Sequence, residues 1–442
     1  MAKGLRNLPI AFEEPGLTHF AGIALIHAFC QQLGLKRLLQ RCLRPAPRAR
    51  DYQPAELLLA LLYAIIVGLD RINATQILQY NGAFQRIVGL PHFPDQTALR
   101  RFLRRLRPRH IRQLVRLHDQ LRQALFARPR PRSSLVFDLD SVVLVIYGHA
   151  EGARVGYNPK KRGRRSYHPL LCFEAHHQEF WHGSLRPGNT VAATGAVPFL
   201  RVCLAKVPPG IARARIRVRG DAGFFGKRVV EFLDGAGVGY TIVAKEHAPI
   251  KRLARGWRFT LLRSGWEVGE FAYQPGRWAA AHRFVVVRRP IPTDPVEAKQ
   301  LTLFTDTKYA YHVVVTNLRT HPWRVWRFYA ARARIEKHIR ELLYDYPLAR
   351  IPTAEWCPNV AFFQLLLFAF DLMHYFRRLC LPPAYRTATL KTVRRELLVI
   401  PGRLVKSKNR YRLKLPKEYH FRRAFEYAVR RIQKLTPPPH IV

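Results

Sequence analysis

Apolar side chains recur at three- and four-residue intervals through the first part of the chain. The segments HFAGIALIHAFCQQLGLKRLLQ (19–40) and AELLLALLYAIIVGL (55–69) show this spacing most clearly. Because residues at i, i+3 and i+4 share one face of an α-helix, the spacing predicts helices. We therefore expect residues 17–127 to be helical and to belong to an N-terminal domain over 1–130.

A strongly basic segment, PDQTALRRFLRRLRPRHIRQLVRLHDQL (94–121), lies inside this helical region. Asp95 or Thr97 can cap the helix that follows, since short polar side chains accept hydrogen bonds from the first free backbone N–H groups. Its packing face consists of Leu99, Phe102, Leu103 and Leu106. The other face is rich in arginine and includes Arg100, Arg101 and Arg104. We interpret the segment as a DNA-contacting helix in a helix-turn-helix-like arrangement, with a solvated basic helix as the alternative.

The hydrophobic period changes after the stretch ARPRPRSS (127–134), which we interpret as a linker. Strands are predicted at 135–146, about 170–175, 180–185, just before residue 221, and at 240–244. Helices are predicted at 191–205 and 227–235. A strand, its hairpin partners and then alternating helices and strands are the order of a mixed sheet covered by helices. This order suits a ribonuclease-H-like domain, which we place at residues 131–350.

Residues 250–320 interrupt that order with a β-rich insertion that contains WEVGEFAYQ, HRFVVVRRP and KYAYHVVVTN. The region 351–442 is predicted to be basic and mainly helical, with a hairpin at 403–416 and an amphipathic helix at 420–435. The predicted fold class is therefore α/β. It combines a ribonuclease-H-like mixed sheet and its β-rich insertion with an all-helical N-terminal domain and a mainly helical C-terminal region.

Charge indicates the class of partner. The chain has 75 Lys and Arg against 29 Asp and Glu, a formal net charge of +46. A protein with this excess gains affinity for nucleic acid by releasing counterions. Small basic packing proteins lack a large core, whereas 48% of these 442 residues are apolar, enough for two or three domains. A ribosomal or chromatin-packing protein, or an arginine-rich surface that reflects a GC-rich genome, stays open as an alternative.

The six cysteines form no CxxC pair, so the sequence supports neither a zinc ribbon nor a disulfide framework. The most apolar runs, 57–69 and 360–370, are shorter than the ~20 residues of a membrane span and are predicted to be buried core helices. The first ten residues lack the apolar stretch of a secretory signal. We expect a soluble cytoplasmic protein, associated with the nucleoid and without a membrane partner.

Three acidic residues stand in contexts that suit metal chemistry. Asp140 closes the apolar run LVFDLD, Asp221 follows RIRVRG, and Glu336 lies on a helix predicted over 328–346. Carboxylates at strand ends and on a later helix can converge on two Mg²⁺ ions, which clamp the attacking and leaving oxygens of a phosphodiester. Asp138 and Asp140 project from the same strand face, about 6.6 Å apart along it, and one of them suffices as a ligand. A turn cap or an ion pair with arginine is the alternative for each aspartate alone.

Tyr329, Arg332 and Glu336 stand at i, i+3 and i+7, which places them on one stripe of the predicted helix. Such a stripe offers one metal ligand beside a guanidinium that can grip a phosphate. A surface ladder of ion pairs would produce the same spacing and stays open as the alternative.

The loop GYNPKKRGRRSYHP (156–169) places five basic residues between Tyr157 and Tyr167. The five are Lys160, Lys161, Arg162, Arg164 and Arg165. Basic side chains grip the phosphate backbone and aromatic rings stack on bases, so we interpret the loop as a DNA contact near the first aspartate. A solvated basic loop is the alternative.

The β-rich insertion carries three tryptophans: Trp257, Trp266 and Trp278. An aromatic ring at such a position could hold a base that has flipped out of the DNA stack. Core packing is nevertheless the interpretation that we favour for each ring.

These blocks resemble bacterial insertion-sequence transposases of the DDE class, in particular the group with a β-strand insertion before the glutamate and a Y-x2-R-x3-E-x6-K signature. The segments DLDSVVLVIYGHAEGARVGYNPKKRGRRSYHPLL (138–171) and LRPGNT (185–190) resemble one subgroup closely. RGDAGFF and the block of Tyr329, Arg332 and Glu336 match in order and context. The four blocks together cover about residues 135–346.

The resemblance implies that Asp140, Asp221 and Glu336 are catalytic and hold two Mg²⁺ ions, with Mn²⁺ as a substitute. It implies that Tyr329 and Arg332 position the phosphate beside the scissile bond. The implied partners are double-stranded DNA, namely the inverted-repeat ends of the element and the target, and a second copy of the chain. The implied reaction is cleavage of these ends by two-metal hydrolysis, followed by joining of the 3′ ends to target DNA.

Two details of the resemblance concern single residues. Asp140 rather than Asp138 matches the catalytic position, because the family's aspartate is followed by Ser or Thr, here Ser141. The signature's lysine falls at position 343, where this chain has Leu343, so its contact with a DNA phosphate is in doubt, and Arg340 could supply a substitute charge. A domesticated or inactive descendant that only binds DNA, or a host ribonuclease-H-like nuclease, stays open as an alternative function.

Overall fold

The computed structural model describes residues 10, 12–44, 51–126, 133–156, 158, 161–291, 304–305, 309–408 and 410–436. The chain divides into two compact units. The helical unit comprises Met1–Leu125 together with Glu341–Val442, and the sheet unit comprises Phe126–Arg340. The N-terminal and C-terminal regions, expected as separate domains, thus share one unit. The helix Ile23–Gln32 (α1) packs on Arg422–Gln433 (α16), and Trp356–Cys380 (α14) packs on Pro54–Val67 (α3) and Gln96–Arg105 (α6).

The helical unit confirms the helices predicted over 17–127. Its N-terminal part contains β1 (Leu17–Thr18), α1 (Ile23–Gln32), α2 (Leu35–Cys42), α3 (Pro54–Val67), η1 (Ile72–Thr75), α4 (Gln76–Gln79), α5 (Gly82–Ile87), α6 (Gln96–Arg105) and α7 (Pro108–Phe126). Its C-terminal part contains α14 (Trp356–Cys380), η4 (Pro383–Thr387), α15 (Leu390–Val393), η5 (Arg394–Leu398), β15 (Gly402–Ser407), β16 (Arg410–Lys414) and α16 (Arg422–Gln433). β15 and β16 are the predicted basic hairpin, and β1 pairs with β15 to complete a three-stranded sheet.

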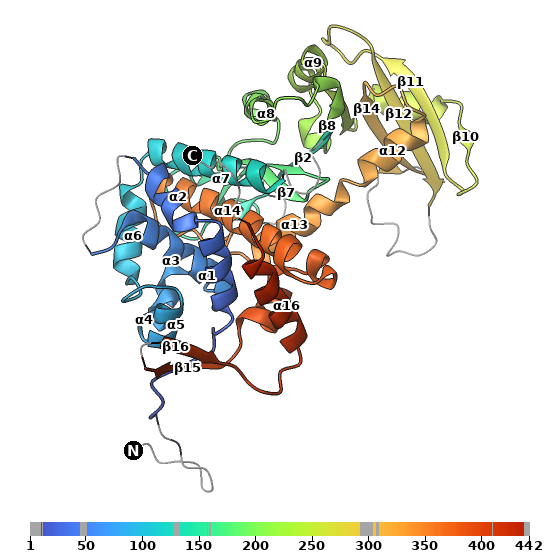
Figure 1. Ribbon diagram of the computed structural model, residues 1–442. Coiled ribbons are helices and arrows are strands. Elements are labelled where there is room, and N and C mark those ends of the chain that lie inside the picture. Colours follow the sequence, from blue (N-terminus) through green and yellow to red (C-terminus); the bar gives the residue numbers. More distant parts are fainter. Residues whose placement is uncertain are drawn as a thin grey trace. The chain divides into compact units, whose positions relative to one another are not determined.

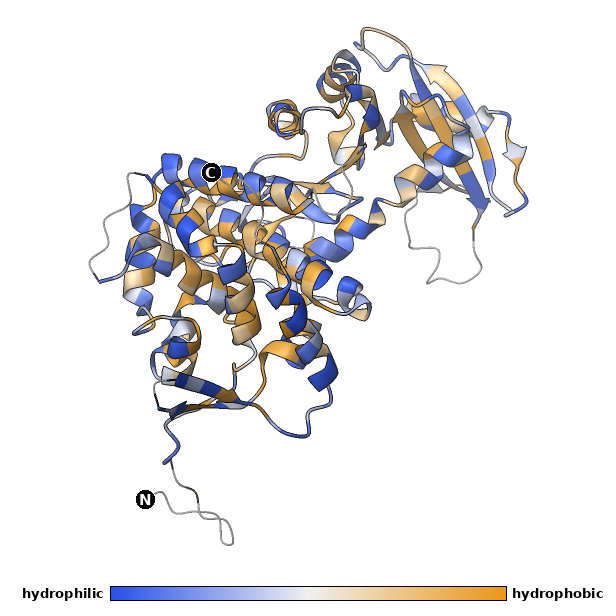
Figure 2. Cartoon of the chain, in the orientation of Figure 1, coloured by the Kyte–Doolittle hydropathy of each residue, from blue (hydrophilic) through white to orange (hydrophobic). Residues whose placement is uncertain are grey.

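Two apolar helices, α3 and α14, form the centre of the helical unit. α3 begins with a capping box between Gln53 and Glu56, and it ends at Gly68, whose φ of 100° favours glycine. Every residue of α3 from 57 to 67 is buried. Figure 2 shows α3 and α14 mainly in orange, whereas α16 is largely blue. The prediction that both apolar runs lie in buried core helices is confirmed.

Within the described part of the chain, α14 alone has the length and composition that would allow a helix to cross a membrane. It is 25 residues long, well beyond the apolar run 360–370. However, 83% of its most apolar window is buried inside the protein, as is usual for a core helix. The helix is therefore weak evidence for a membrane span.

The start of α6 confirms one local prediction. The Oδ1 atom of Asp95 accepts hydrogen bonds from the backbone N–H groups of Thr97 at 2.7 Å and Ala98 at 2.8 Å. Asp95 rather than Thr97 is therefore the cap. The apolar face of α6, which includes Leu99 and Phe102, is buried.

The sheet unit contains a ten-stranded mixed sheet (Figure 1). Its strands are β2 (Leu135–Ser141), β6 (Leu170–Glu174), β7 (Glu179–Ser184), β8 (Ile216–Gly220), β9 (Gly239–Val243), β10 (Thr260–Leu261), β11 (Glu267–Tyr273), β12 (His282–Pro290), β13 (Phe304–Thr305) and β14 (Tyr309–Thr316). The order across the sheet is β10-β11-β12-β14-β9-β8-β2-β6-β7, and β13 pairs with β14. β8 lies parallel to both β2 and β9, and the other pairs are antiparallel. The predicted mixed sheet is confirmed.

The β-rich insertion extends this sheet beyond β9. Alternation along β12 shows that both faces are covered: Phe284 and Val286 belong to one apolar cluster, and Val285 and Val287 to the other. Because successive strand residues point to opposite faces, such a strand must be buried on both sides. α8 (Ala196–Ala205) and α9 (Lys227–Gly235) contribute to the first cluster, and α12 (Pro322–Ala330) contributes to the second.

A buried ion pair joins β2 to β8 and α12. Asp138 is fully buried, and its two carboxylate oxygens accept hydrogen bonds from Arg219 Nε at 2.5 Å and Nη2 at 2.7 Å. Arg219 Nη1 donates to the backbone oxygen of Phe328 at 2.6 Å. The pair is bidentate and largely satisfied, which is the condition under which a buried charge is tolerated. It ties the two strands that carry the acidic site to the helix covering them.

We expect Arg219→Ala to lower the free energy of unfolding by about 3–5 kcal/mol, because it leaves the Asp138 carboxylate buried without its partner. Urea denaturation at neutral pH measures this loss. Arg217→Ala is the matched control: Arg217 is exposed on the same face of β8 and also lies over the Phe328 ring, but it has no buried carboxylate partner among the described residues, so the variant should change the midpoint little. Replacing the pair together, Asp138→Leu with Arg219→Met, should recover most of the loss. Equal effects of Arg219→Ala and Arg217→Ala would show that the pair does not hold the sheet.

Candidate active site

The first acidic position lies where β2 ends. Asp140 is the penultimate residue of the strand, and its side chain is 14% exposed. Its Oδ1 atom accepts a hydrogen bond from the backbone N–H of Ser141 at 2.8 Å. Asp138, two residues earlier, is committed to Arg219, so Asp140 is the aspartate of this strand that stands beside the other acidic positions.

The second acidic position follows β8, the parallel neighbour of β2. The carboxyl ends of parallel neighbours meet at one edge of a sheet, so Asp221 comes close to Asp140. Asp221 Oδ1 accepts a hydrogen bond from the N–H of Gly223 at 2.8 Å, which caps the short helix η3 (Ala222–Phe224). A Cβ atom at Gly223 would lie 2.9 Å from that oxygen, which explains the glycine in RGDAGFF. The Asp221 side chain stays 42% exposed.

Arg332 lies between these two carboxylates. Its Nη2 atom is 3.3 Å from Asp140 Oδ1 and 3.8 Å from Asp221 Oδ2, and it donates to the backbone oxygen of Leu139 at 2.8 Å. The side chain is 7% exposed. Burial lowers the pKa of Arg332, but Asp140 and other neighbours raise it above its ordinary value overall. The guanidinium is therefore a permanent positive charge between two acidic groups.

The third acidic position, Glu336, lies in the first turn of α13 (Ala333–Tyr344) and is exposed. Its charge reaches the site: burial raises the pKa of Asp140 to about 6, Arg332 opposes the rise, and Asp221 and Glu336 add to it. The three acidic side chains thus share one electrostatic environment. Arg332 offsets part of their mutual repulsion.

The donor chemistry of this site fits a divalent cation. Carboxylate oxygens are the ligands that Mg²⁺ prefers, and three carboxylates beside one guanidinium leave a net negative charge. In the described ranges, no group of three or more His, Cys, Asp or Glu side chains is close enough together to hold a metal ion. Asp140, Asp221 and Glu336 thus fit a metal by residue type and charge, but in this structure they are not gathered closely enough to form a metal site, and Arg332 stands as the cation between the first two.

The predicted single helix over 328–346 is wrong. α12 ends at Ala330 and α13 begins at Ala333, so Tyr329, Arg332 and Glu336 do not share one helical stripe. The N–H of Arg332 donates to the backbone oxygen of Tyr329 at 2.8 Å, an i to i−3 bond that tightens the turn. Arg332 lies in this turn, and its side chain is buried against the end of β2. Tyr329 is also buried and packs on Trp326, with ring centroids 5.6 Å apart.

A second network beside Asp140 was not predicted from the sequence. His168 Nδ1 lies 2.6 Å from the backbone oxygen of Thr190, so that nitrogen carries the proton and donates. Its Nε2 atom then accepts a hydrogen bond from the hydroxyl of Ser141, and the distance from Nε2 to Oγ is 3.0 Å. Burial lowers the pKa of His168, which favours the neutral ring. The only sequence signal was the presence of SYHPLL and LRPGNT among the family-like blocks.

The LRPGNT segment holds this histidine in place. Arg186 donates from Nε to the backbone oxygen of His168 at 2.9 Å and from Nη1 to that of Thr194 at 2.6 Å. Gly188 passes so close to the neighbouring backbone that a Cβ atom would lie 2.1 Å from the oxygen of Ser166. The conformation of the segment therefore depends on its arginine and its glycine.

The basic loop lies on a small sheet formed by β3 (Leu144–Val145), β5 (Arg165–Tyr167) and β4 (Arg154–Val155). Lys160 and Tyr157 lie outside the described residues. The other four basic side chains are exposed: Lys161, Arg162, Arg164 and Arg165. Tyr167 is fully buried and donates to the backbone oxygen of Glu151, so it cannot stack on a base as expected. Tyr147, which the sequence did not single out, is 70% exposed, and its hydroxyl lies 2.6 Å from Lys161 Nζ.

The remaining predicted residues form no contact with the acidic cluster among those that the structure shows for it. On α6, Arg101 is exposed, Arg100 bonds to Gln96 and Asn73, and Arg104 pairs with Glu355 at 2.6 Å. Arg340 is exposed on α13. Core packing is confirmed for Trp278 and Trp266, which belong to or pack against the two apolar clusters. Trp257 is 40% exposed and packs on Phe271.

Comparison with known proteins finds a family model that matches almost the whole chain. Residues 3–437 match the model of a family described as "Transposase DDE domain group 1". No curated protein sequence matches the chain. The piggyBac transposase synaptic complex with hairpin DNA is similar over 82% of this chain and 77% of that chain, with 11% identity and a TM-score of 0.44. The Mos1 transposase paired-end complex with the left transposon end is similar over 44% of this chain and 59% of that chain, with 13% identity and a TM-score of 0.18.

We expect Asp140→Asn to stabilise the metal-free protein above pH 6. Burial raises the pKa of Asp140 from 3.8 to about 6, so the folded protein binds this proton more tightly than the unfolded chain does. Ionisation therefore costs stability as the pH rises between these two values, and the full cost of about 3 kcal/mol at most is present above pH 6. The variant cannot ionise, so its gain should appear in urea denaturation at pH 7.5 with chelator and vanish near pH 4.

The matched control for this measurement is Asp51→Asn, at an exposed aspartate of the helical unit. It should show no comparable gain. A gain for Asp140→Asn that stays constant from pH 4 to pH 7.5 would contradict the assignment, since it could not come from the ionisation of this carboxyl group.

Proposed function

This chain belongs to the DDE transposase family, and we propose that it binds the inverted-repeat ends of an insertion sequence, cleaves them and joins the 3′ ends to target DNA. Asp140, Asp221 and Glu336 are the catalytic residues of the proposal. The observation that carries it is that Asp140 and Asp221 both lie within 4 Å of Nη2 of Arg332, at 3.3 and 3.8 Å, with the charge of Glu336 acting on Asp140. A purely structural ion pair needs only one carboxylate for its arginine.

The sheet supports a ribonuclease-H-like arrangement for the catalytic part. Three antiparallel strands, β7, β6 and β2, are followed across the sheet by β8 and β9, which run parallel to β2. This order places the ends of β2 and β8 side by side. We propose a catalytic domain over residues 131–350, with the β insertion between β9 and α12 and with DNA-binding regions over 1–130 and 351–442.

Two Mg²⁺ ions, or Mn²⁺ in their place, would be held by Asp140, Asp221 and Glu336. When bound they supply the positive charge that activates a water or a 3′-hydroxyl and stabilises the leaving oxygen. The protein's own part is to hold the acidic oxygens at one edge of a rigid sheet. Arg332, anchored on the backbone of β2, balances their charge and would lie beside the phosphate at the scissile bond.

The exposed basic residues supply the proposed contacts with DNA. Four of them come after the strand that carries Asp140 in the sequence: Lys161, Arg162, Arg164 and Arg165. Tyr147, held at Lys161, presents a ring on which a base can stack. We propose double-stranded DNA as the partner and a homodimer as the species that pairs two ends, acting in the cytoplasm at the nucleoid. Arg100, Arg101, Arg104 and Arg340 are further proposed DNA contacts.

We expect Asp140→Ala, Asp221→Ala and Glu336→Ala each to reduce cleavage of element ends by about 10³-fold or more, because each removes a ligand that no neighbour replaces. Binding of the same DNA, measured by fluorescence anisotropy, should change little. Glu418→Ala, at an exposed acidic residue of the helical unit, is the matched control and should cleave normally. Normal cleavage by any of the three alanine variants would remove that residue from the site.

We expect Arg332→Gln to destabilise the metal-free protein by about 3–5 kcal/mol, because it removes the cation that separates two partly buried carboxylates. Addition of Mg²⁺ should restore more stability to this variant than to the wild type, since the ion replaces the missing charge. Thermal unfolding with chelator and with Mg²⁺ measures both effects. Arg334→Gln, at an exposed arginine two residues later, is the control. Equal Mg²⁺ responses in Arg332→Gln and wild type would contradict the role of Arg332 as the balancing charge.

A further inference from the structure

The two aspartates of the acidic site are oriented in the same way. Oδ1 of Asp140 accepts a hydrogen bond from the backbone N–H of Ser141, and Oδ1 of Asp221 accepts one from the N–H of Gly223, each at 2.8 Å. Neither Oδ2 atom accepts a hydrogen bond from a described residue. The backbone that follows each aspartate therefore sets the direction of its carboxylate and leaves the second oxygen for a ligand.

His168 supports the backbone after Asp140. Its Nε2 atom accepts from the hydroxyl of Ser141, and its Nδ1 atom donates to the backbone oxygen of Thr190 at 2.6 Å. The histidine is 5% exposed, so water competes little for these two bonds. The ring thereby connects the residue that holds Asp140 to the 186–194 segment, which lies between β7 and α8.

The 186–194 segment also packs against the turn after Asp221. A Cβ atom at Gly223 would lie 2.8 Å from Cβ of Ala192, so the two residues are in close contact. The two aspartates follow from different strands, β2 and β8, yet one segment supports the backbone that orients each of them. A change in its conformation would therefore alter both carboxylates together.

Arg186 fixes the conformation of this segment. Its guanidinium donates to four backbone oxygens, those of His168, Val191, Ala192 and Thr194, at 2.9, 3.3, 3.4 and 2.6 Å. The side chain is buried and forms no ion pair with a described carboxylate. Burial lowers the pKa of Arg186 to about 10, so the guanidinium stays charged at neutral pH. A buried charge without a counter-charge costs stability, and residues retained at such a cost commonly serve function.

We propose that Arg186 and His168 are positioning residues: through the 186–194 segment they orient the two catalytic aspartates for a divalent cation. His168 acts through Ser141, and Arg186 acts by holding the segment as a whole. Arginine offers several donors in a fixed fork, whereas the ammonium group of lysine cannot reach the same set of carbonyl oxygens. The inference rests on the proposed function for the identity of the site, and it adds residues that act on the carboxylates indirectly.

Binding of Mn²⁺ to the full-length protein tests the role of Arg186 without DNA or catalysis. The electron paramagnetic resonance signal of the free ion measures this binding, and Asp140→Ala identifies the part of it that belongs to the acidic site. We expect Arg186→Lys to raise the dissociation constant of that part about 10- to 100-fold, the usual loss when support behind a metal ligand is removed.

Arg394→Lys is the matched control for Arg186→Lys. Arg394 also donates to backbone oxygens, those of Ile65, Ile66 and Asp345, but it does so in the helical unit. Thermal unfolding with chelator should show a loss of stability for both variants. Only Arg186→Lys should weaken Mn²⁺, whereas the control should stay within about twofold of the wild type.

A double-mutant cycle tests the path from His168 through Ser141. His168→Leu and Ser141→Ala each remove the bond between the two side chains, and each should raise the Mn²⁺ dissociation constant. The double variant should bind no more weakly than the weaker single variant, because the two changes remove the same interaction. Ser141→Thr keeps the hydroxyl and should keep most of the affinity. Ser141→Ala and Ser141→Thr test the path even if His168→Leu does not fold.

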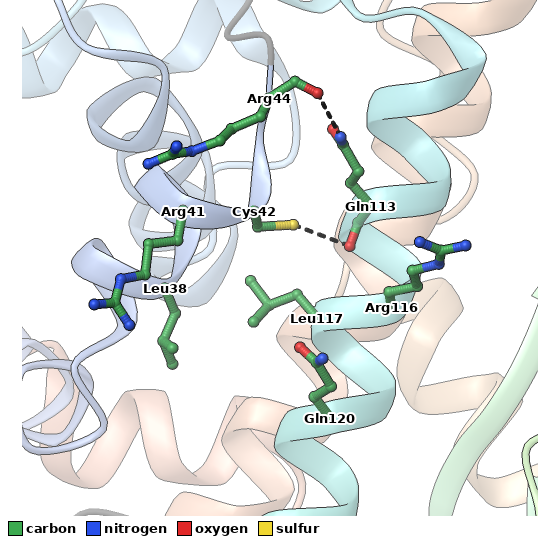
Figure 3. A pocket seen from close by; sticks show the side chains of 8 residues that line it. All are labelled: Leu38, Arg41, Cys42, Arg44, Gln113, Arg116, Leu117 and Gln120. Atoms are coloured by element: carbon green, nitrogen blue, oxygen red, sulfur yellow. Dashed lines mark hydrogen bonds between the residues drawn. The ribbon is translucent and has the colours of Figure 1, made fainter. Parts of the chain in front are cut away.

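Gln113 provides the matched control for His168. Figure 3 shows its side chain bonded to the backbone oxygen of Arg44, and the distance of 2.6 Å equals that of the bond from His168 to Thr190. Gln113→Leu thus removes a comparable bond to a backbone oxygen, but in the helical unit. It should leave Mn²⁺ binding unchanged.

The outcomes separate this inference from the proposed function. Equal Mn²⁺ affinities in Arg186→Lys, Arg394→Lys and the wild type would overturn the positioning role of the arginine. Additive effects of His168→Leu and Ser141→Ala would overturn the path through the serine. Unchanged Mn²⁺ binding in Asp140→Ala would instead reject the acidic site itself, on which the proposed function also depends.

Discussion

Repulsion between acidic groups at one sheet edge is the constraint that organises the sheet unit. The parallel pairing of β2 and β8 brings Asp140 and Asp221 to that edge, and the resulting charge must be balanced. Arg332, in the turn between α12 and α13, balances it in the free protein. Its hydrogen bond to the backbone oxygen of Leu139 fixes the guanidinium at the end of β2.

Two aspartates on the same face of β2 illustrate how position decides the role of a charge. Asp138 is enclosed by a bidentate arginine and holds β2, β8 and α12 together. Asp140 lies two residues nearer the strand end. Its Oδ1 atom is 3.3 Å from Nη2 of Arg332, and its side chain stays partly exposed to solvent. A fully satisfied carboxylate has no capacity left for a metal or a substrate. The partly satisfied one retains it, at a cost in stability that is usual for functional groups.

The basic residues of the chain serve several local structures. Some form hydrogen bonds inside the protein. Arg186 holds the segment beside His168 in this way, and Arg219 forms the buried pair with Asp138. Others remain exposed and form no ion pair with a described carboxylate, as in the basic loop. Only the second kind contributes to attraction for a polyanion. The net charge of +46 therefore overstates the number of arginines that can contact DNA.

Local pattern was sufficient for most of the elements, although not for the break between α12 and α13. The three- and four-residue spacing placed the buried helices α3 and α14, the strand-rich segments placed the mixed sheet, and Asp95 was recognisable as a cap. The positions of Asp140 and Asp221 at strand ends followed from the same signals. These features depend on neighbours within one turn or one strand, which the order of residues contains directly.

Contacts between distant segments were decided only by the tertiary structure. The sequence could not separate Asp138 from Asp140 by environment, show that Tyr167 is buried while Tyr147 is exposed, or place His168 against Ser141. It also could not show that the first and last hundred residues share one unit. Each of these depends on which side chains meet across the fold. Hydrophobic periodicity records which face of an element is buried, but it does not record the partner that buries it.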